Sequence, residues 1–113
     1  METTIKIFKA LSDEARLRIF LLFIHSEELC VCELVNILKI EQSRISHSIR
    51  ILREAGLIVS RREGRWIIYS INPAMKNNEI IHGLKKEVKS PEQDLKNFAE
   101  CNKKNIREKC KCN

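Results

Sequence analysis

The sequence predicts a mainly α-helical domain that contains one small β-hairpin, and three observations support this prediction. Apolar residues recur at helical spacing in four segments before residue 56. Two runs rich in β-branched and aromatic residues follow, separated by a glycine. A short predicted helix, a tight turn and a longer predicted helix directly precede the hairpin. Together these features predict a winged helix-turn-helix with the element order ααααββα.

The first two predicted helices cover residues 3–11 and 14–25. Ile5, Phe8 and Leu11 give the first helix its apolar stripe, and Ser12 is a good N-cap for the second. The second helix is apolar nearly all round, which is typical of a helix buried at the centre of a small domain. Its expected role is therefore structural.

The third and fourth predicted helices form the helix-turn-helix. We expect a turn at residues 27–29, a short helix at 32–38, a connection at 39–41 and a longer helix at 42–55. Gly56 stands where a left-handed residue ends a helix favourably. Residues 57–62 and 66–71 then read as two strands around Gly64, and this hairpin resembles the wing of a winged helix.

The C-terminal part of the chain is predicted to hold one further helix and an extension. Pro73 suits the first turn of a helix over residues 74–89, with Asn72 as its cap. Its apolar stripe is narrow, so we expect it to pack on a partner chain. A possible sixth helix follows Pro91 and leads to a polar tail. We therefore divide the chain into a DNA-binding and dimerisation domain at residues 1–89 and a cysteine-bearing extension at 90–113.

Composition and charge favour a DNA-binding protein that stays inside the cell. The net charge of +6 is uneven, because residues 41–65 carry six arginines against three acidic residues and no lysine. Arginine is the residue that pairs bidentately with phosphate and guanine. No apolar run reaches the roughly 18 residues that span a bilayer, and the N-terminus has no secretory pattern. We expect a cytoplasmic protein with no membrane partner.

The polar face of the fourth predicted helix has the residue types that read the major groove. Glutamine pairs with adenine, arginine pairs with guanine, and serine and histidine bond base edges or phosphates. Arg44 and Arg53 flank this face and could hold the DNA backbone, and the wing adds three more arginines. The predicted DNA-binding residues are Gln42, Ser43, Arg44, Ser46, His47, Arg50, Arg53, Arg61, Arg62 and Arg65.

The five cysteines are predicted to be ligands or redox centres rather than structural disulfides. Their number is odd, and closely spaced thiols in a reducing cytosol favour such roles. Cys30 and Cys32 stand at the start of the third predicted helix, and thiolates select soft ions. Residues i and i+2 of a regular helix point to different faces. We therefore expect both sulfurs to hold one ion only if the first turn unwinds, which would disturb the recognition helix.

Several separated blocks of the sequence are similar, in the same order, to the signature of the ArsR/SmtB winged-helix repressors. They are residues 8–16, 42–47, 52–58, 61–65 and 69–70, so the resemblance covers about the first 70 residues. It implies a homodimer built through the first and last helices. It also implies binding to an imperfectly palindromic operator and release when a metal or metalloid binds.

Residues 28–34 further resemble the thiol box of the arsenic-sensing and cadmium/lead-sensing members. This implies As(III) as the effector, with Sb(III), Cd(II) and Pb(II) as alternatives, and no organic cofactor. A third ligand could come from Cys101, Cys110 or Cys112, including those of the other subunit. Alternatively, two thiolates suffice, as they would for a methylated trivalent arsenical. Cys110 and Cys112 could equally be a redox pair outside the site.

Three functional interpretations remain open. The first is an arsenic(III)-responsive repressor, and the second is a repressor of the same fold that senses thiol oxidation or cadmium and lead. The third is a thiol enzyme or metal-carrying protein, which we consider remote. The sequence has no Cys-x-x-Cys pair, no phosphate loop and no nucleophile–base pattern. We therefore expect a regulator and not an enzyme.

Overall fold

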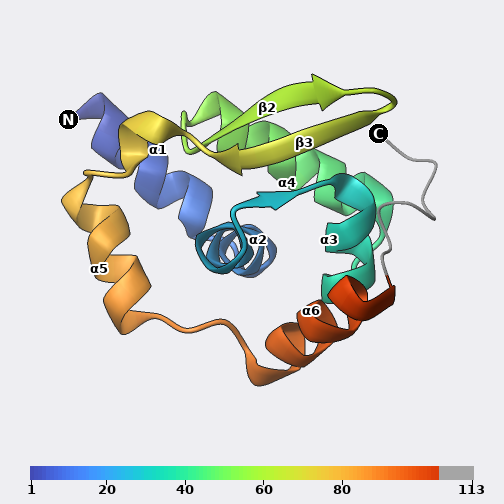
Figure 1. The fold of residues 1–113 in the computed structure, drawn as a ribbon. Coiled ribbons are helices and arrows are strands. Elements are labelled where there is room, and N and C mark those ends of the chain that lie inside the picture. The colour runs from blue at the N-terminus through green and yellow to red at the C-terminus, as the bar shows by residue number, and fades with distance from the viewer. Residues whose placement is uncertain (105–113) are drawn as a thin grey trace.

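The computed structural model describes residues 1–104 and contains both parts of the predicted winged helix-turn-helix (Figure 1). Helices α1 (Glu2–Leu11), α2 (Glu14–His25), α3 (Val31–Leu38) and α4 (Gln42–Glu54) come first. Strands β2 (Ile58–Glu63) and β3 (Trp66–Ile71) form the hairpin. A 3₁₀ turn η1 (Pro73–Met75) and helices α5 (Glu79–Glu87) and α6 (Glu92–Lys104) complete the described chain. The predicted fold class is therefore confirmed.

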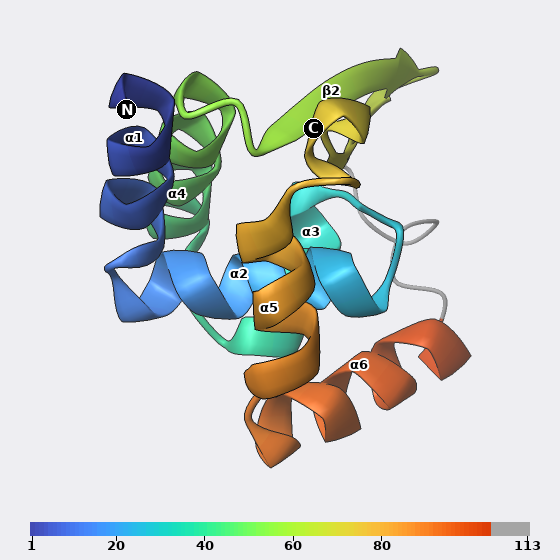
Figure 2. The same cartoon turned by 90° about the vertical axis from the view of Figure 1, so that its left-hand side faces the viewer.

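Helix α2 is the centre of the domain, as its apolar sequence predicted. Phe20, Leu22 and Phe23 are almost completely buried, together with the apolar faces of α3 and α4. Figures 1 and 2 show the sheet over one side of α2, α5 crossing beside it and α6 on the side away from the sheet. The predicted N-cap of α2 is wrong. Asp13, rather than Ser12, accepts a hydrogen bond of 3.1 Å from the backbone N–H of Arg16.

The region expected to be a turn before α3 contains a short strand, β1 (Glu28–Leu29). It pairs antiparallel with β3, placing Glu28 opposite Ser70 and Leu29 opposite Tyr69. The sheet order is β1-β3-β2, so the hairpin is joined to the segment that leads into the thiol pair. Two residues give too short a pattern to predict a strand from alternation. Its partner on β3 stabilises it instead.

The predicted helix over residues 74–89 is wrong in extent. Asn72 and Pro73 do begin a turn, but it is the 3₁₀ turn η1, and a second cap at Asn78 starts α5. Asn78 accepts a hydrogen bond of 2.9 Å from the N–H of Ile80, which satisfies a donor at the new helix start. The competing asparagine cap therefore shortens the helix. Ile81 is its buried residue, and Ile80 and Leu84 pack partly against the core.

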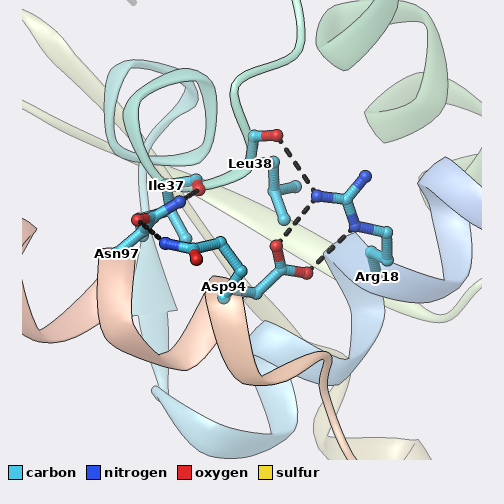
Figure 3. Close-up of polar contacts among 6 residues, drawn as sticks. Arg18, Ile37, Leu38, Asp94 and Asn97 are labelled. Atoms are coloured by element: carbon cyan, nitrogen blue, oxygen red, sulfur yellow. Dashed lines mark hydrogen bonds and ion pairs between the residues drawn. The ribbon is translucent and has the colours of Figure 1, made fainter.

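Helix α6 is docked on α2 and α3 rather than extended away from them (Figure 3). Asp94, only 2% exposed, forms an ion pair with Arg18 of α2. Asn97 donates a 2.8 Å hydrogen bond to the carbonyl oxygen of Ile37 in α3. Cys101 lies in the same core cluster as α2. No described helix is long and apolar enough to cross a membrane.

Candidate functional site

The polar face of α4 is presented to solvent as expected. Ile45, Ile49 and Leu52 are buried against the core, and this fixes the rotation of the helix. All seven predicted DNA-binding residues of this helix are exposed: Gln42, Ser43, Arg44, Ser46, His47, Arg50 and Arg53. The arrangement provides a solvent-facing row of donors and acceptors of the kind that reads base edges.

Two residues of this face contact each other. The Nη2 of Arg50 lies 3.0 Å from the Nδ1 of His47. A guanidinium has no acceptor, so the Nδ1 atom accepts the hydrogen bond and the ring proton is placed on Nε2. The Nε2–H of His47 is thereby available as a donor. This favours contact with an acceptor such as guanine O6 or N7, or thymine O4.

The turn between α3 and α4 is tight because of Lys39. This residue closes α3 in the left-handed conformation, at φ 58°, and is the only non-glycine residue with a positive φ among residues 1–104. Its N–H donates 3.0 Å to the carbonyl oxygen of Val35. The chain therefore reverses within three residues. The end of α3 and the start of α4 are thus joined by a short connection.

The wing arginines differ in what they contact. Arg61, Arg62 and Arg65 are all exposed. Arg61 is engaged within the sheet, where its Nη2 and Nε lie 2.8 and 3.1 Å from Oε2 of Glu28. It also pairs with Glu63, and these two carboxylates raise its pKa. To bind a DNA phosphate, Arg61 would therefore have to leave the carboxylates of Glu28 and Glu63.

Arg65 occupies the other end of the wing, next to the hairpin turn. Its guanidinium carbon lies 4.8 Å from the centroid of the Trp66 ring, in a cation–π arrangement. Gly64 at the turn has φ 60°, the left-handed conformation that glycine adopts without strain. The turn thus places Arg65 at the tip while its side chain is steadied by the ring.

The thiol pair stands at the first turn of α3. Cys30 is the N-cap, with an extended backbone, and Cys32 lies inside the helix. Both pack in one small cluster with Ile68 of β3, and Trp66 covers this cluster. The structure therefore changes the expected geometry. Because Cys30 precedes the helix, the two side chains reach the same cluster without any unwinding.

A capping box holds this end of α3 together. The N–H of Cys30 donates 3.0 Å to Oε1 of Glu33, and the Cys30 sulfur receives the N–H of Glu33 in return. The sulfur of Cys30 is thus already used to cap the helix. An ion that binds this sulfur competes with the cap.

Cys32 takes part in a disulfide in the structure. Only the thiolate form of cysteine is a metal ligand. Ion binding at Cys32 therefore requires that this sulfur is first reduced.

Among residues 1–104, the other candidate ligand, Cys101, is not brought to this cluster. Cys101 is 2% exposed in the main core with α2 and α3, not in the cluster of Cys30 and Cys32. Among residues 1–104, no group of three cysteine, histidine or acidic side chains is close enough to hold one metal ion. Cys110 and Cys112 lie outside the described residues.

Sequence reasoning missed Trp66 and Glu33 as parts of the thiol site. A signal for Trp66 was available, because residues i and i+2 of a strand face the same side, and Ile68 is apolar. A signal for Glu33 was its place three residues after Cys30, the spacing of a capping box. The pairing of β1 with β3, which joins the wing to the segment before Cys30, has no local sequence pattern.

Comparison with known proteins gives a consistent result. The model of the family described as bacterial regulatory protein, arsR family, matches residues 13–60. The arsenic resistance transcriptional regulator ArsR1 of Pseudomonas putida is 45% identical over 67 residues, which are 59% of this chain and 52% of the relative. The chain thus spans about half the length of that relative.

Two further comparisons cover more of the molecule. The cadmium resistance transcriptional regulatory protein CadC of Listeria innocua is 35% identical over 88 residues, 78% of this chain and 71% of the relative. Reduced HlyU from Vibrio cholerae is similar in structure, with a TM-score of 0.66 at 26% identity. That likeness covers 78% of this chain and 92% of the other.

Proposed function

The chain belongs to the ArsR family of bacterial regulatory proteins, and on this premise we propose that it represses transcription by binding operator DNA and is released by a soft ion. The ion is As(III), bound by the thiolates of Cys30 and Cys32. The members compared above are transcriptional regulators and not enzymes. The single observation that carries the proposal is the position of the thiol pair at the N-terminus of α3, the first helix of the helix-turn-helix.

DNA binding is supported by the exposed face of α4 and by the wing. The ten predicted residues are all exposed, and seven of them are arginine or histidine. We propose that α4 enters the major groove and that Arg62 and Arg65 contact the phosphates beside it. A homodimer would place two such helices on the two halves of an imperfect palindrome. The exposed apolar residues of α1, Ile5 and Phe8, support this assembly.

Ion binding is supported by the chemistry of the donors. Thiolates prefer soft ions, and the cluster around the two sulfurs is otherwise apolar. A third thiolate could come from Cys110 or Cys112 of the same or the other subunit. Cys101 could serve only if α6 moved, because its side chain is buried in the core. A methylated trivalent arsenical would need two thiolates alone.

Release from DNA follows from the capping box. A bound ion draws the Cys30 sulfur away from the N–H of Glu33, so the first turn of α3 loses a cap. Loss of an N-cap costs about 1 kcal/mol, and the distortion reaches α4 through the tight turn at Lys39. DNA binding needs α4 in one position, so operator affinity falls.

A second candidate function is supported by the disulfide at Cys32. In this alternative, oxidation of the thiols replaces ion binding as the signal, while the repressor and its DNA-binding face are the same. Cadmium or lead sensing is a further alternative within the family, since the similar protein from Listeria innocua is named a cadmium resistance regulator.

The experiment uses the full chain, reduced with a thiol-free reductant, and an operator selected from random duplexes. Fluorescence anisotropy follows dissociation as arsenite is added. Arsenite should release wild-type protein, whereas Cys30→Ser and Cys32→Ser should stay bound. Cys101→Ser is the matched control and should respond like wild type. If both thiol variants dissociate normally, the sensing assignment is wrong. Dissociation by peroxide but not by arsenite would favour the redox alternative.

A further inference from the structure

Trp66 lies between the thiol pair and the tip of the wing. Its indole covers the cluster formed by Cys30, Cys32 and Ile68. The adjacent residue, Arg65, holds its guanidinium over the same ring at 4.8 Å from the centroid. A displacement of the indole therefore moves the ring that the guanidinium of Arg65 contacts. We assign this exposed arginine to DNA contact. No other wing arginine has this contact among the described residues.

Main-chain pairing also connects the wing to the segment before the thiol pair. Strand β1 ends directly before Cys30 and is paired with β3, the strand that carries Trp66. Glu28 of β1 also pairs with Arg61 of β2 at 2.8 Å, across the width of the sheet. The wing is thus attached to the N-terminal end of the sensing helix by main-chain and side-chain contacts. The wing is therefore attached to β1 as well as to α4.

The indole also carries an unused donor. Nε1 of Trp66 is buried and has no hydrogen-bond partner among the described residues. A buried donor without a partner is unfavourable, and a thiol is only a weak acceptor. When arsenous acid binds two thiols, two As–S bonds replace two As–O bonds and two water molecules leave. The remaining As–OH oxygen is then a better acceptor within this cluster than a thiol.

We propose that Trp66 is part of the ion site and couples it to the wing, so that ion binding weakens the phosphate contact of Arg65. This inference rests on the proposed function, because it takes the thiol pair to be the ion site. It adds a second route of release besides the distortion of α3 and α4. The indole reorients toward the new acceptor and no longer supports the guanidinium of Arg65.

The first measurement uses Trp66 as a reporter, because it is the only tryptophan in the chain. Arsenite titrated into reduced wild-type protein without DNA should change the tryptophan emission and saturate at one equivalent per chain. Cys30→Ser should abolish the change. An emission that is unaffected by saturating arsenite overturns the coupling.

The second measurement compares two wing arginines. Operator affinity is measured over a range of salt concentrations, with and without saturating arsenite. Each phosphate contact contributes about 0.9 to the slope of log K against log salt. Arsenite should therefore lower the wild-type slope by about 1 per chain. Arg65→Ala should lose this arsenite effect, and Arg62→Ala, the matched control, should keep it. Both variants should bind the operator more weakly than wild type even without arsenite. The readout is therefore the change that arsenite causes in the salt slope of each variant.

Trp66→Phe keeps a ring beneath Arg65 but removes the N–H donor. It should bind one arsenite per chain, measured by elemental analysis after gel filtration, yet show a several-fold smaller loss of operator affinity. If wild type is released and Arg65→Ala and Trp66→Phe respond as wild type does, the coupling is wrong and the proposed function stands. If arsenite neither releases wild type nor alters its emission, both are overturned.

Discussion

Asp94 of α6 forms a bidentate pair with Arg18 of α2, with Nη2 to Oδ1 at 2.8 Å and Nε to Oδ2 at 3.0 Å (Figure 3). The same Nη2 donates 3.2 Å to the carbonyl oxygen of Leu38, the last residue of α3. This carboxylate raises the pKa of Arg18 through its hydrogen bonds. One ionic pair thus fixes α2, α3 and α6 relative to one another, at the end of α3 remote from the thiols.

Asp94→Asn should destabilise the fold by about 2 kcal/mol, because a hydrogen-bonded charge is removed and the Arg18 guanidinium stays partly buried. Urea unfolding at neutral pH, followed by circular dichroism, measures this change. Lys96→Ala is the matched control on the same helix. Its exposed pair with Glu92 should contribute less than about 0.5 kcal/mol. Equal losses for the two variants would contradict a structural role of the Asp94 pair.

The docking of α6 could not be predicted from the sequence, although much of the fold could. The winged helix-turn-helix could be predicted, since α2 and α4 carry long periodic patterns and the hairpin has a glycine turn. The pairing of Asp94 with Arg18 spans 76 residues and leaves no local pattern. The strand β1 is similar, because two residues become a strand only beside β3. The cysteines of the thiol cluster could be predicted from their spacing, whereas Trp66 was left out although its place in the predicted strand was a signal.

We expect the arsenic to have two or three sulfur ligands, depending on whether a cysteine of the C-terminal tail binds it. X-ray absorption at the arsenic edge of the arsenite-bound chain counts As–S contacts directly. If a tail thiolate completes the site, Cys110→Ser or Cys112→Ser should reduce the count from three to two. Cys101→Ser should leave it unchanged, because that side chain is buried in the core. A reduced count in Cys101→Ser would instead mean that α6 undocks when arsenite binds.

The exposed apolar face of α1 should be the centre of the homodimer. Phe8 is 56% exposed and Ile5 46%, although both are large apolar residues of a helix that also packs on α2 and α4. Phe8→Glu places a charge where the partner's apolar surface should lie, so sedimentation equilibrium should show a monomer at micromolar concentration. Val59→Glu is the control, since Val59 is an exposed apolar residue of the wing. Dimers of unchanged affinity in Phe8→Glu would exclude α1 from the interface.

Arg50 and His47 should determine sequence discrimination, whereas Arg62 should determine affinity for DNA of any sequence. A direct base contact contributes about 1–3 kcal/mol of discrimination, so Arg50→Ala and His47→Ala should each lower the operator-to-random affinity ratio roughly tenfold. Because these two side chains are hydrogen-bonded to each other, the double variant should lose less than the product of the single losses.

Arg62→Ala provides the contrast, since Arg62 is exposed on the wing and assigned to phosphate. It should weaken operator and random DNA alike and lower the salt slope by about 1 for each phosphate contact that is lost. Anisotropy titrations with both duplexes over a range of salt concentrations test all the variants together. The division of roles fails if the three single variants lose discrimination equally, because α4 and the wing would then read the operator in the same way.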